Sequence, residues 1–282
     1  MNILRNIQLT GADDRPFLLD FYIKQNGQRK PVIIFTHGFK GFKDYGCWDL
    51  VAKRFVENGF AFIKYNFSHN GTTIEQPMAF ADLEAFGNNN FTKELYDLGK
   101  VIDWVANGDV GVPINELSRR DVYLVGHSRG GAATLLKAIE DHRVKKLATW
   151  AGVSNLNRYI QDKEGVAVWK EKGVHYVQNS RTKQNMPLYY QLYEDIVANK
   201  DQFDIPNKLS ETKAKGLIVH GIADETVPWQ SALEITEANP NFEKLLIANM
   251  DHGLGGKQPW GEDYLPTQMK YVIDCCADFF IG

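Results

Sequence analysis

Short apolar runs alternate with segments of helical periodicity along most of the chain. The apolar runs are nearly continuous and have the length of strands, at residues 31–38, 59–67, 121–127, 145–151, 215–221 and 244–248. Runs of this kind are typical of strands that are covered on both faces. Apolar stripes at helical spacing occur between or after them, at residues 47–58, 92–106, 132–140, 228–238 and 266–280. This alternation predicts an α/β fold built on a doubly wound, mostly parallel sheet.

The first thirty residues have a different pattern. Two alternating stretches, Ile3 to Leu9 and Phe17 to Ile23, are separated by Gly-Ala-Asp-Asp. They predict a hairpin of edge strands. This hairpin is also the candidate surface for a homodimer, because an exposed edge can pair with another chain. No feature of the sequence requires such a dimer.

Residues 154–212 interrupt the alternation. The segment is polar, is rich in Asn, Lys, Gln and Tyr, and lies between two strands that one helix would otherwise join. A structureless loop of this length is uncommon inside a compact domain. We therefore expect one domain over residues 1–282 with a small inserted cap at 154–212. The cap is predicted to contain a helix near 155–171, two short strands around 174–179 and 181–186, and a helix over 187–197.

Composition and charge narrow the range of functions. Apolar residues make up 44% of the 282 residues, which is ample for a core. The formal net charge is −3 and the basic residues are scattered, so neither a nucleic acid nor a membrane is an expected partner. No apolar run approaches the ~20 residues of a membrane helix, and the N-terminus lacks the pattern of a signal peptide. Cys47, Cys275 and Cys276 form no disulfide framework or metal-ligand spacing. We expect a cytoplasmic protein with a small-molecule partner.

The strongest chemical signal is Gly-His-Ser-Arg-Gly-Gly at residues 126–131, which follows an apolar strand and precedes a helix-forming sequence. A nucleophile elbow requires this setting, because its strained turn exposes a serine between small residues. Gly126 and Gly130 supply the small residues on either side of Ser128. The alternative is a glycine-rich turn that binds phosphate, but the glycine spacing and the lysine of the usual nucleotide-binding motifs are absent. We predict that Ser128 is a nucleophile.

A serine hydroxyl needs a base, and the base needs an acid that orients it. Of the seven histidines, His252 is the one that lies in the loop after the last strand. Asp224 directly follows the strand at 215–221 and is the first candidate for the acid. Glu225 ranks second. Asp251 ranks third, because a side chain next to His252 does not easily turn back onto the same ring.

Backbone N–H groups are expected to stabilise the oxyanion of the reaction. Arg129 follows the nucleophile and supplies one donor, and Phe39, in the turn after the first parallel strand, is the expected second donor. A plain tight turn is the alternative for Phe39. Aromatic residues are frequent in and near the cap, and most are expected to pack it onto the core. Trp169 and Tyr190 are named as candidates for lining an acyl or aryl pocket.

These motifs, in this order, resemble the α/β-hydrolase family over nearly the whole chain. They are His-Gly-Phe at 37–39, the elbow at 126–131, Gly-Ile-Ala-Asp-Glu-Thr-Val-Pro at 221–228 and Asp-His-Gly at 251–253. Within the family the chain is most similar to dienelactone-hydrolase-like acyl esterases, particularly to feruloyl and cinnamoyl esterases with a cap after the sixth core strand. The resemblance implies ester hydrolysis through an acyl-enzyme, with no metal or organic cofactor. Many of those esterases have glutamine at the position of Arg129, whose side chain we expect to pair with a nearby carboxylate.

The sequence therefore predicts a serine carboxylesterase that acts on small to medium acyl or aryl esters. Thioesters and acyl-aminoacyl peptides are alternative substrates for the same chemistry, although peptidases of that kind usually carry a large additional N-terminal domain. A non-catalytic binding module is disfavoured, because it would be expected to lack one of the three residues Ser128, Asp224 and His252.

Overall fold

A central sheet of eight strands organises the protein. The computed structural model describes residues 1–107, 111–160 and 162–282. The strands lie in the order β1 (Asn2–Thr10), β2 (Pro16–Ile23), β4 (Ala61–Tyr65), β3 (Lys30–Thr36), β5 (Leu117–His127), β6 (Val144–Trp150), β9 (Lys215–Gly221) and β10 (Phe242–Ile247). β2 pairs antiparallel with both of its neighbours, and every pairing from β4 to β10 is parallel. The predicted mostly parallel sheet is confirmed.

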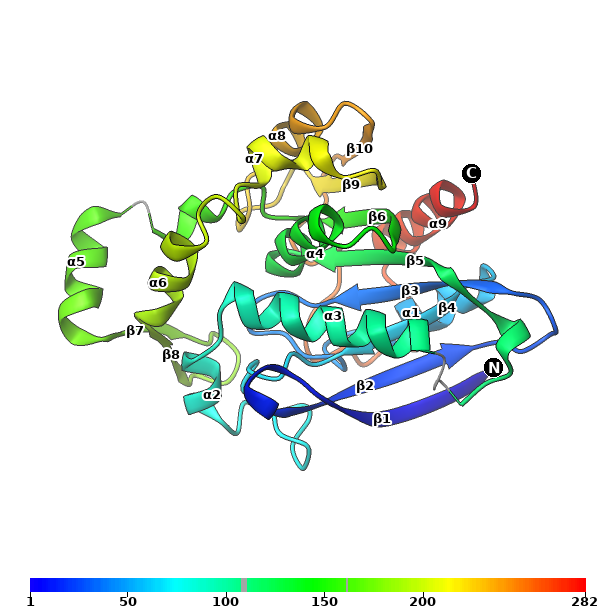
Figure 1. The fold of residues 1–282 in the computed structure, drawn as a ribbon, viewed down its shortest axis with the longest axis horizontal. Helices are drawn as coiled ribbons and strands as arrows, with labels where there is room; N and C mark the ends of the chain where they lie inside the picture. The colour runs from blue at the N-terminus through cyan, green and yellow to red at the C-terminus, as the bar shows by residue number, and fades with distance from the viewer. Residues whose placement is uncertain (108–110, 161) are drawn as a thin grey trace.

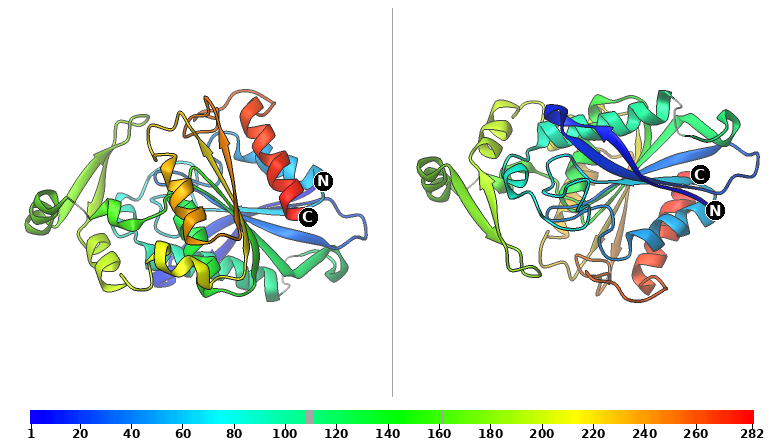
Figure 2. Two further views of the ribbon diagram at one scale, coloured as in Figure 1. Left: turned by 90° about the horizontal axis from the view of Figure 1, so that it is seen from above. Right: turned by 90° about the horizontal axis from the view of Figure 1, so that it is seen from below.

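The central strands are buried on both faces, as their continuous apolar sequences predict. In β3, Val32 and Ile34 belong to one core cluster and Ile33 and Phe35 to the other, because successive side chains point to opposite faces. The first cluster is covered by α3 (Phe91–Asn107), α4 (Arg129–Glu140) and α8 (Gln230–Ala238). The second is covered by α1 (Trp48–Glu57) and α9 (Thr267–Ile281). The two views of Figure 2 show these helices on opposite sides of the sheet, which makes it doubly wound.

The N-terminal hairpin differs from the prediction in one respect. β1 is the edge strand, and its residues are mostly exposed. β2 lies inside the sheet between β1 and β4, and seven of its eight residues are buried. Only one strand of the hairpin is therefore an edge strand, because β2 carries enough apolar side chains to be covered on both faces.

The segment predicted as a cap starts with two short helices instead of one long helix. A 3-10 turn at Leu156–Tyr159 is followed by α5 (Lys163–Lys172), and residue 161 of the predicted helix near 155–171 lies outside the described residues. Each piece has its own N-cap, because the side chain of Asn155 accepts a hydrogen bond from Asn157 and that of Asp162 from Gly165. Capping side chains satisfy the first amides of a helix and so start a new one. The prediction of a single helix is wrong.

The second strand of this segment begins later than predicted. β7 (Val174–Gln178) pairs with β8 (Asn185–Tyr189), whereas residues 181–183 form the turn between them. Pro187, predicted as the start of a helix, lies in β8, where a two-stranded ribbon leaves one side of each strand without a ladder partner. The helix that follows, α6 (Gln191–Ala198), therefore starts at Gln191.

The inserted segment has a projecting part and a packed part. α5, β7 and β8 extend beyond the end of the sheet at which β3 and β5 terminate (Figure 1). Further along, α7 (Ile205–Lys208) and the turn at Leu209–Glu211 contact α4 and α8, and Ile205 and Leu209 belong to the main core cluster. A short helix, α2 (Leu83–Gly87), lies against β8. No helix in the described part of the chain is long and apolar enough to cross a membrane.

Candidate active site

Three loops at the carboxyl ends of parallel strands bring together the residues predicted as a triad. Ser128 follows β5, Asp224 follows β9, and His252 lies in the loop after β10. The imidazole of His252 is 3.0 Å from the Ser128 hydroxyl through Nε2. Its Nδ1 is 2.8 Å from Oδ2 of Asp224. Parallel strands end at the same edge of a sheet, which explains why positions so distant in sequence meet here.

Ser128 has the backbone conformation of a strained turn. Its φ is 56° and its ψ is −120°, in a region that L-residues rarely adopt. The neighbouring glycines make the turn feasible. A Cβ atom at Gly126 would lie 2.3 Å from the carbonyl oxygen of Gly130, and one at Gly130 would lie 2.3 Å from the carbonyl oxygen of Thr36. The two small residues expected on either side of the serine are therefore required by close backbone contacts.

Asp224 is a buried carboxylate, and both of its oxygens accept hydrogen bonds. Oδ1 accepts hydrogen bonds from the amides of Thr226 and Val227, at 2.8 and 2.9 Å. Oδ2 accepts from His252 and lies 3.3 Å from Nε2 of His220. Burial alone raises the pKa of this carboxyl, but these hydrogen bonds outweigh it and hold the pKa well below its usual range. Asp224 is consequently ionised at neutral pH.

The two alternative acids, Glu225 and Asp251, have other surroundings. Glu225 is exposed, and Asp251 accepts a hydrogen bond from the amide of Gly255. Within the described residues neither carboxylate forms a hydrogen bond with His252.

His127 is a second histidine beside His252 that sequence reasoning set aside. Its Nε2 lies 2.8 Å from the carbonyl oxygen of His252, and the two rings are 4.9 Å apart between centroids. Burial and the neighbouring His252 lower the pKa of His127 to about 3. The ring is therefore neutral at pH 7 and donates its Nε2–H to His252. No sequence pattern predicts this contact, because His127 lies directly before Ser128 within the same motif.

The amides of Phe39 and Arg129 have no hydrogen-bond acceptor in the described part of the chain. Arg129 begins α4, where the first amides of a helix have no intrahelical partner. The turn that contains Phe39 lies close to the serine, because a Cβ at Gly38 would be 3.0 Å from the Cβ of Ser128. The predicted oxyanion donors thus lie on two loops that meet at Ser128.

The side chain of Arg129 points away from this region. Its Nε donates to Oε1 of Glu94 at 2.8 Å, and both side chains are nearly inaccessible to solvent. The guanidinium also lies 4.1 Å from the ring centroid of Phe91. The expectation that Arg129 pairs with a carboxylate is confirmed.

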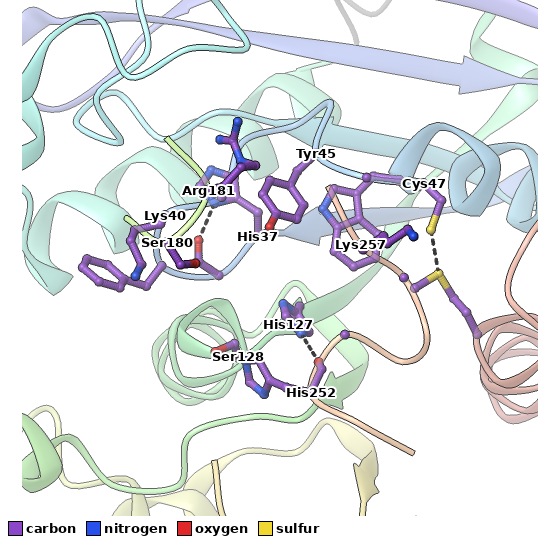
Figure 3. Close-up of a pocket in the computed structure, with 18 of the residues that line it drawn as sticks. His37, Lys40, Tyr45, Cys47, His127, Ser128, Ser180, Arg181, His252 and Lys257 are labelled. Carbon is purple, nitrogen blue, oxygen red and sulfur yellow. Dashed lines mark hydrogen bonds between the residues drawn. The ribbon is translucent and has the colours of Figure 1, made fainter. Parts of the chain in front are cut away.

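A cavity of about 210 Å³ opens in front of Ser128 and His252. Figure 3 shows its walls, which come from the loop after β3, the tip of the β7–β8 hairpin and the loop after β10. Lys40, Tyr45, Arg181 and Lys257 are lining residues that sequence analysis did not single out. They come from loops without a recognisable motif, and only folding brings them together.

Trp169 and Tyr190 do not line this cavity. Nε1 of Trp169 donates to the carbonyl oxygen of Leu188 at 2.8 Å, and its ring contacts that of Tyr190 edge-on. Tyr190 in turn stacks on Tyr193. These aromatic residues pack the inserted segment, as expected for most of its aromatic side chains. Among the described residues, no group of His, Cys, Asp and Glu has an arrangement that could hold a metal ion.

Comparisons with known proteins found solved structures of similar fold. No family model and no curated protein matches the sequence. A putative hydrolase from Agrobacterium vitis S4 is 18% identical, with 100% of both chains covered and a TM-score of 0.74. Mouse alpha/beta hydrolase domain-containing protein 10 is 19% identical, with 98% of both chains covered and a TM-score of 0.70. Est1E from Butyrivibrio proteoclasticus, solved with ferulic acid bound, is 18% identical, with 98% of both chains covered and a TM-score of 0.69.

Proposed function

Starting from the α/β-hydrolase fold, which these structural likenesses establish, we propose that the protein is a serine hydrolase of carboxylic esters. The observation that carries the proposal is the hydrogen-bonded series Asp224, His252 and Ser128, with distances of 2.8 and 3.0 Å. A carboxylate, an imidazole and a hydroxyl in this order form the arrangement that activates a serine. The open cavity in front of the hydroxyl gives an ester access to it.

In the proposed acylation step, Oγ of Ser128 attacks the ester carbonyl and passes its proton to Nε2 of His252. Asp224 holds the Nδ1–H of the ring, which fixes the tautomer and stabilises the imidazolium. The C–O bond of the tetrahedral intermediate then breaks, and Nε2 gives its proton to the leaving alcohol. The acyl group remains on Ser128 as an ester.

In deacylation, water takes the place of the alcohol. His252 accepts a proton from the water as it attacks the acyl carbonyl, and returns a proton to Oγ of Ser128 when the acid leaves. The oxyanion formed in both steps is assigned to the amides of Phe39 and Arg129, which have no other acceptor in the described residues. Removing one such donor costs ~100- to 1,000-fold in kcat in well-studied cases.

The cavity favours esters of modest size. Its volume of about 210 Å³ is below the range of about 300–1,000 Å³ that is usual for drug-sized ligands. We therefore propose short acyl or small aryl esters as the preferred substrates. Thioesters and acyl-aminoacyl peptides fit the same catalytic steps, but no contact in the cavity favours them over esters.

The first experiment is the hydrolysis of 4-nitrophenyl esters from acetate to decanoate and of methyl ferulate, on the wild type and on Ser128→Ala. We expect turnover that declines at long chain lengths and that falls at least ~1,000-fold in the variant, because only the serine supplies the nucleophile. Ser210→Ala is the matched control, since Ser210 is exposed and lies outside the cavity.

A fluorophosphonate probe gives an independent readout of the nucleophile. The probe should label the wild type and Ser210→Ala but not Ser128→Ala. Full ester turnover by a folded Ser128→Ala protein would refute the proposal. If the probe labels Ser128 but the protein hydrolyses no ester, thioesters or peptides become the proposed substrates.

A further inference from the structure

The cavity in front of Ser128 has a one-sided distribution of charge. The chain as a whole contains 35 acidic and 32 basic residues. Lys40, Arg181 and Lys257 line the cavity, and its described lining includes no aspartate or glutamate. Asp224 lies behind His252 with an inaccessible side chain. The three cations come from three separate loops (Figure 3), so local sequence does not account for their meeting.

These cations have no carboxylate partner. Within the described ranges, the side chains of Lys40, Arg181 and Lys257 form no ion pair or hydrogen bond with protein groups. Of the three, Lys40 is half-buried, whereas Arg181 and Lys257 are exposed at the mouth of the cavity. Buried cations elsewhere have carboxylate partners. Lys43 pairs with Asp20 at 2.9 Å, and Arg129 pairs with Glu94 at 2.8 Å. Lys40 lies 5.5 Å from the ring centroid of Phe39, and Arg181 lies 5.9 Å from that of Tyr45. Neither contact supplies a negative charge, so the cavity keeps a net positive charge, a pattern that attracts anions.

Lys40 is the least exposed of the three cations. It is half-buried, and burial lowers the pKa of its ammonium group because the charged form loses hydration. Its φ is 57°, a conformation that favours glycine or asparagine. The backbone conformation of the turn therefore does not explain why position 40 is a lysine. A bound anion would compensate the charge that this lysine holds at the edge of the site.

Tyr45 adds a neutral donor to the same cavity. Its hydroxyl has no hydrogen-bond partner among the described residues. Figure 3 shows the hydroxyl of Tyr45 directed into the cavity. A carboxylate has two oxygens and accepts from several donors at once, so an ammonium group and a hydroxyl together suit it.

We infer that the substrate of this site is an ester that carries a second, anionic group, which the positive charges of Lys40, Arg181 and Lys257 attract to the cavity. The inference rests on the proposed ester hydrolysis. The small cavity favours a compact anion such as the free carboxylate of a dicarboxylic acid monoester. The carboxylate lies either in the acyl part or in the alcohol part of the ester.

Matched pairs of substrates test the charge with only a small change in the size of the ester. Mono-4-nitrophenyl glutarate against 4-nitrophenyl pentanoate places the charge in the acyl part. The butanoate ester of 4-hydroxybenzoate against the butanoate ester of methyl 4-hydroxybenzoate places it in the alcohol part. We expect kcat/KM to favour the anionic member of one pair by ~10-fold or more at low salt, and the preference to shrink as salt screens the charges.

Variants identify the groups that recognise the anion. Lys40→Gln and Lys257→Gln should each reduce the ratio of anionic to neutral kcat/KM, by ~10-fold for the double variant. Tyr45→Phe should reduce it less. Lys270→Gln is the control, because Lys270 is exposed on α9 and lies outside the cavity. A ratio near one in the wild type, or a ratio that the double variant leaves unchanged, would overturn the inference and leave ester hydrolysis intact.

A binding measurement separates recognition from turnover. Calorimetric titration of Ser128→Ala with monoethyl glutarate and with ethyl pentanoate should show tighter binding of the anion. The preference should be lost when Lys40→Gln and Lys257→Gln are added to Ser128→Ala. If the wild type hydrolyses no ester but this preference is found, the proposed function fails while anion recognition stands. Equal binding of both ligands would overturn the inference directly.

Discussion

At the scale of single residues, the site depends on groups that hold His252 in place. Asp224 fixes one ring nitrogen, and His127 donates to the backbone carbonyl of His252 at 2.8 Å. Nε2 of His220 lies between the carbonyl oxygen of Val227, at 3.0 Å, and Asp224. His252 is therefore held by Asp224 and His127, and Asp224 in turn contacts His220, which limits the directions in which the ring of His252 can move.

His127 is predicted to act as a positioning residue. His127→Phe keeps an aromatic ring but removes the donor to His252, so we expect kcat to fall by ~10- to 100-fold with KM nearly unchanged, as small misplacements of a catalytic group do. His127→Gln retains an N–H donor and should restore part of the loss. Steady-state kinetics on one short-chain ester would measure both. Equal losses in the two variants would indicate a packing role instead.

At the scale of elements, the inserted segment divides into parts of different burial. In α5 the only buried residue is Trp169, and β7 has no buried residue. Leu192, Ile196, Ile205 and Leu209, which follow in α6, α7 and the next turn, are each at most 2% exposed and belong to the main core cluster. The tip of the hairpin is ordered locally, since Oδ1 of Asn179 accepts from the amides of Arg181 and Thr182.

Hydrogen exchange should follow this division. We expect the amides of α5 and β7 (163–178) to exchange much faster than those of β3 and β5, because a two-stranded ribbon with little buried surface opens easily. The amides of 191–211 should instead approach the protection of the core. Mass spectrometry of exchange at neutral pH, resolved by peptide, would test this. Uniform protection across 154–212 and the central sheet would contradict it and would argue against a mobile cap.

At the scale of the whole molecule, burial of several histidines links stability to pH. Burial is the largest cause that lowers the pKa of His37 to about 4, of His69 to about 4 and of His127 to about 3. In the unfolded chain a histidine has a pKa of about 6.5. Between these values the unfolded state binds more protons than the folded state, so the free energy of unfolding falls as pH falls.

The protein should therefore lose stability between about pH 7 and pH 4. Each of the three histidines contributes a slope of up to about 1.4 kcal/mol per pH unit in this window. Asp97 opposes them below its own pKa of about 6, which burial raises, because the folded state then holds the additional proton. We expect a lower melting temperature at pH 5 than at pH 7, measured by calorimetry.

His69 offers a test of this explanation away from the cavity. His69→Gln removes one buried imidazole, so the stability of the variant should depend less steeply on pH. His142→Gln is the control, because His142 is exposed. A dependence equally steep in the wild type and in His69→Gln would show that other groups control acid sensitivity.

The sequence by itself determined most of the sheet, because burial on both faces produces continuous apolar runs and each covering helix carries an apolar stripe. It also pointed to Ser128, Asp224 and His252, since a nucleophile elbow is a local pattern and loops after parallel strands meet at one edge. It failed where local signals compete, as in residues 155–171, where Asn155 and Asp162 each cap a separate helix.

The tertiary structure alone decided what surrounds the serine. Lys40, Arg181 and Lys257 lie on loops far apart in sequence, and their shared cavity results from how the β7–β8 hairpin and two loops pack against each other. Trp169 and Tyr190 were expected near the substrate on composition alone, yet they pack together within the inserted segment. Long-range packing leaves no periodic trace in the chain, so charge placement in the cavity is a property of the fold and not of any single segment.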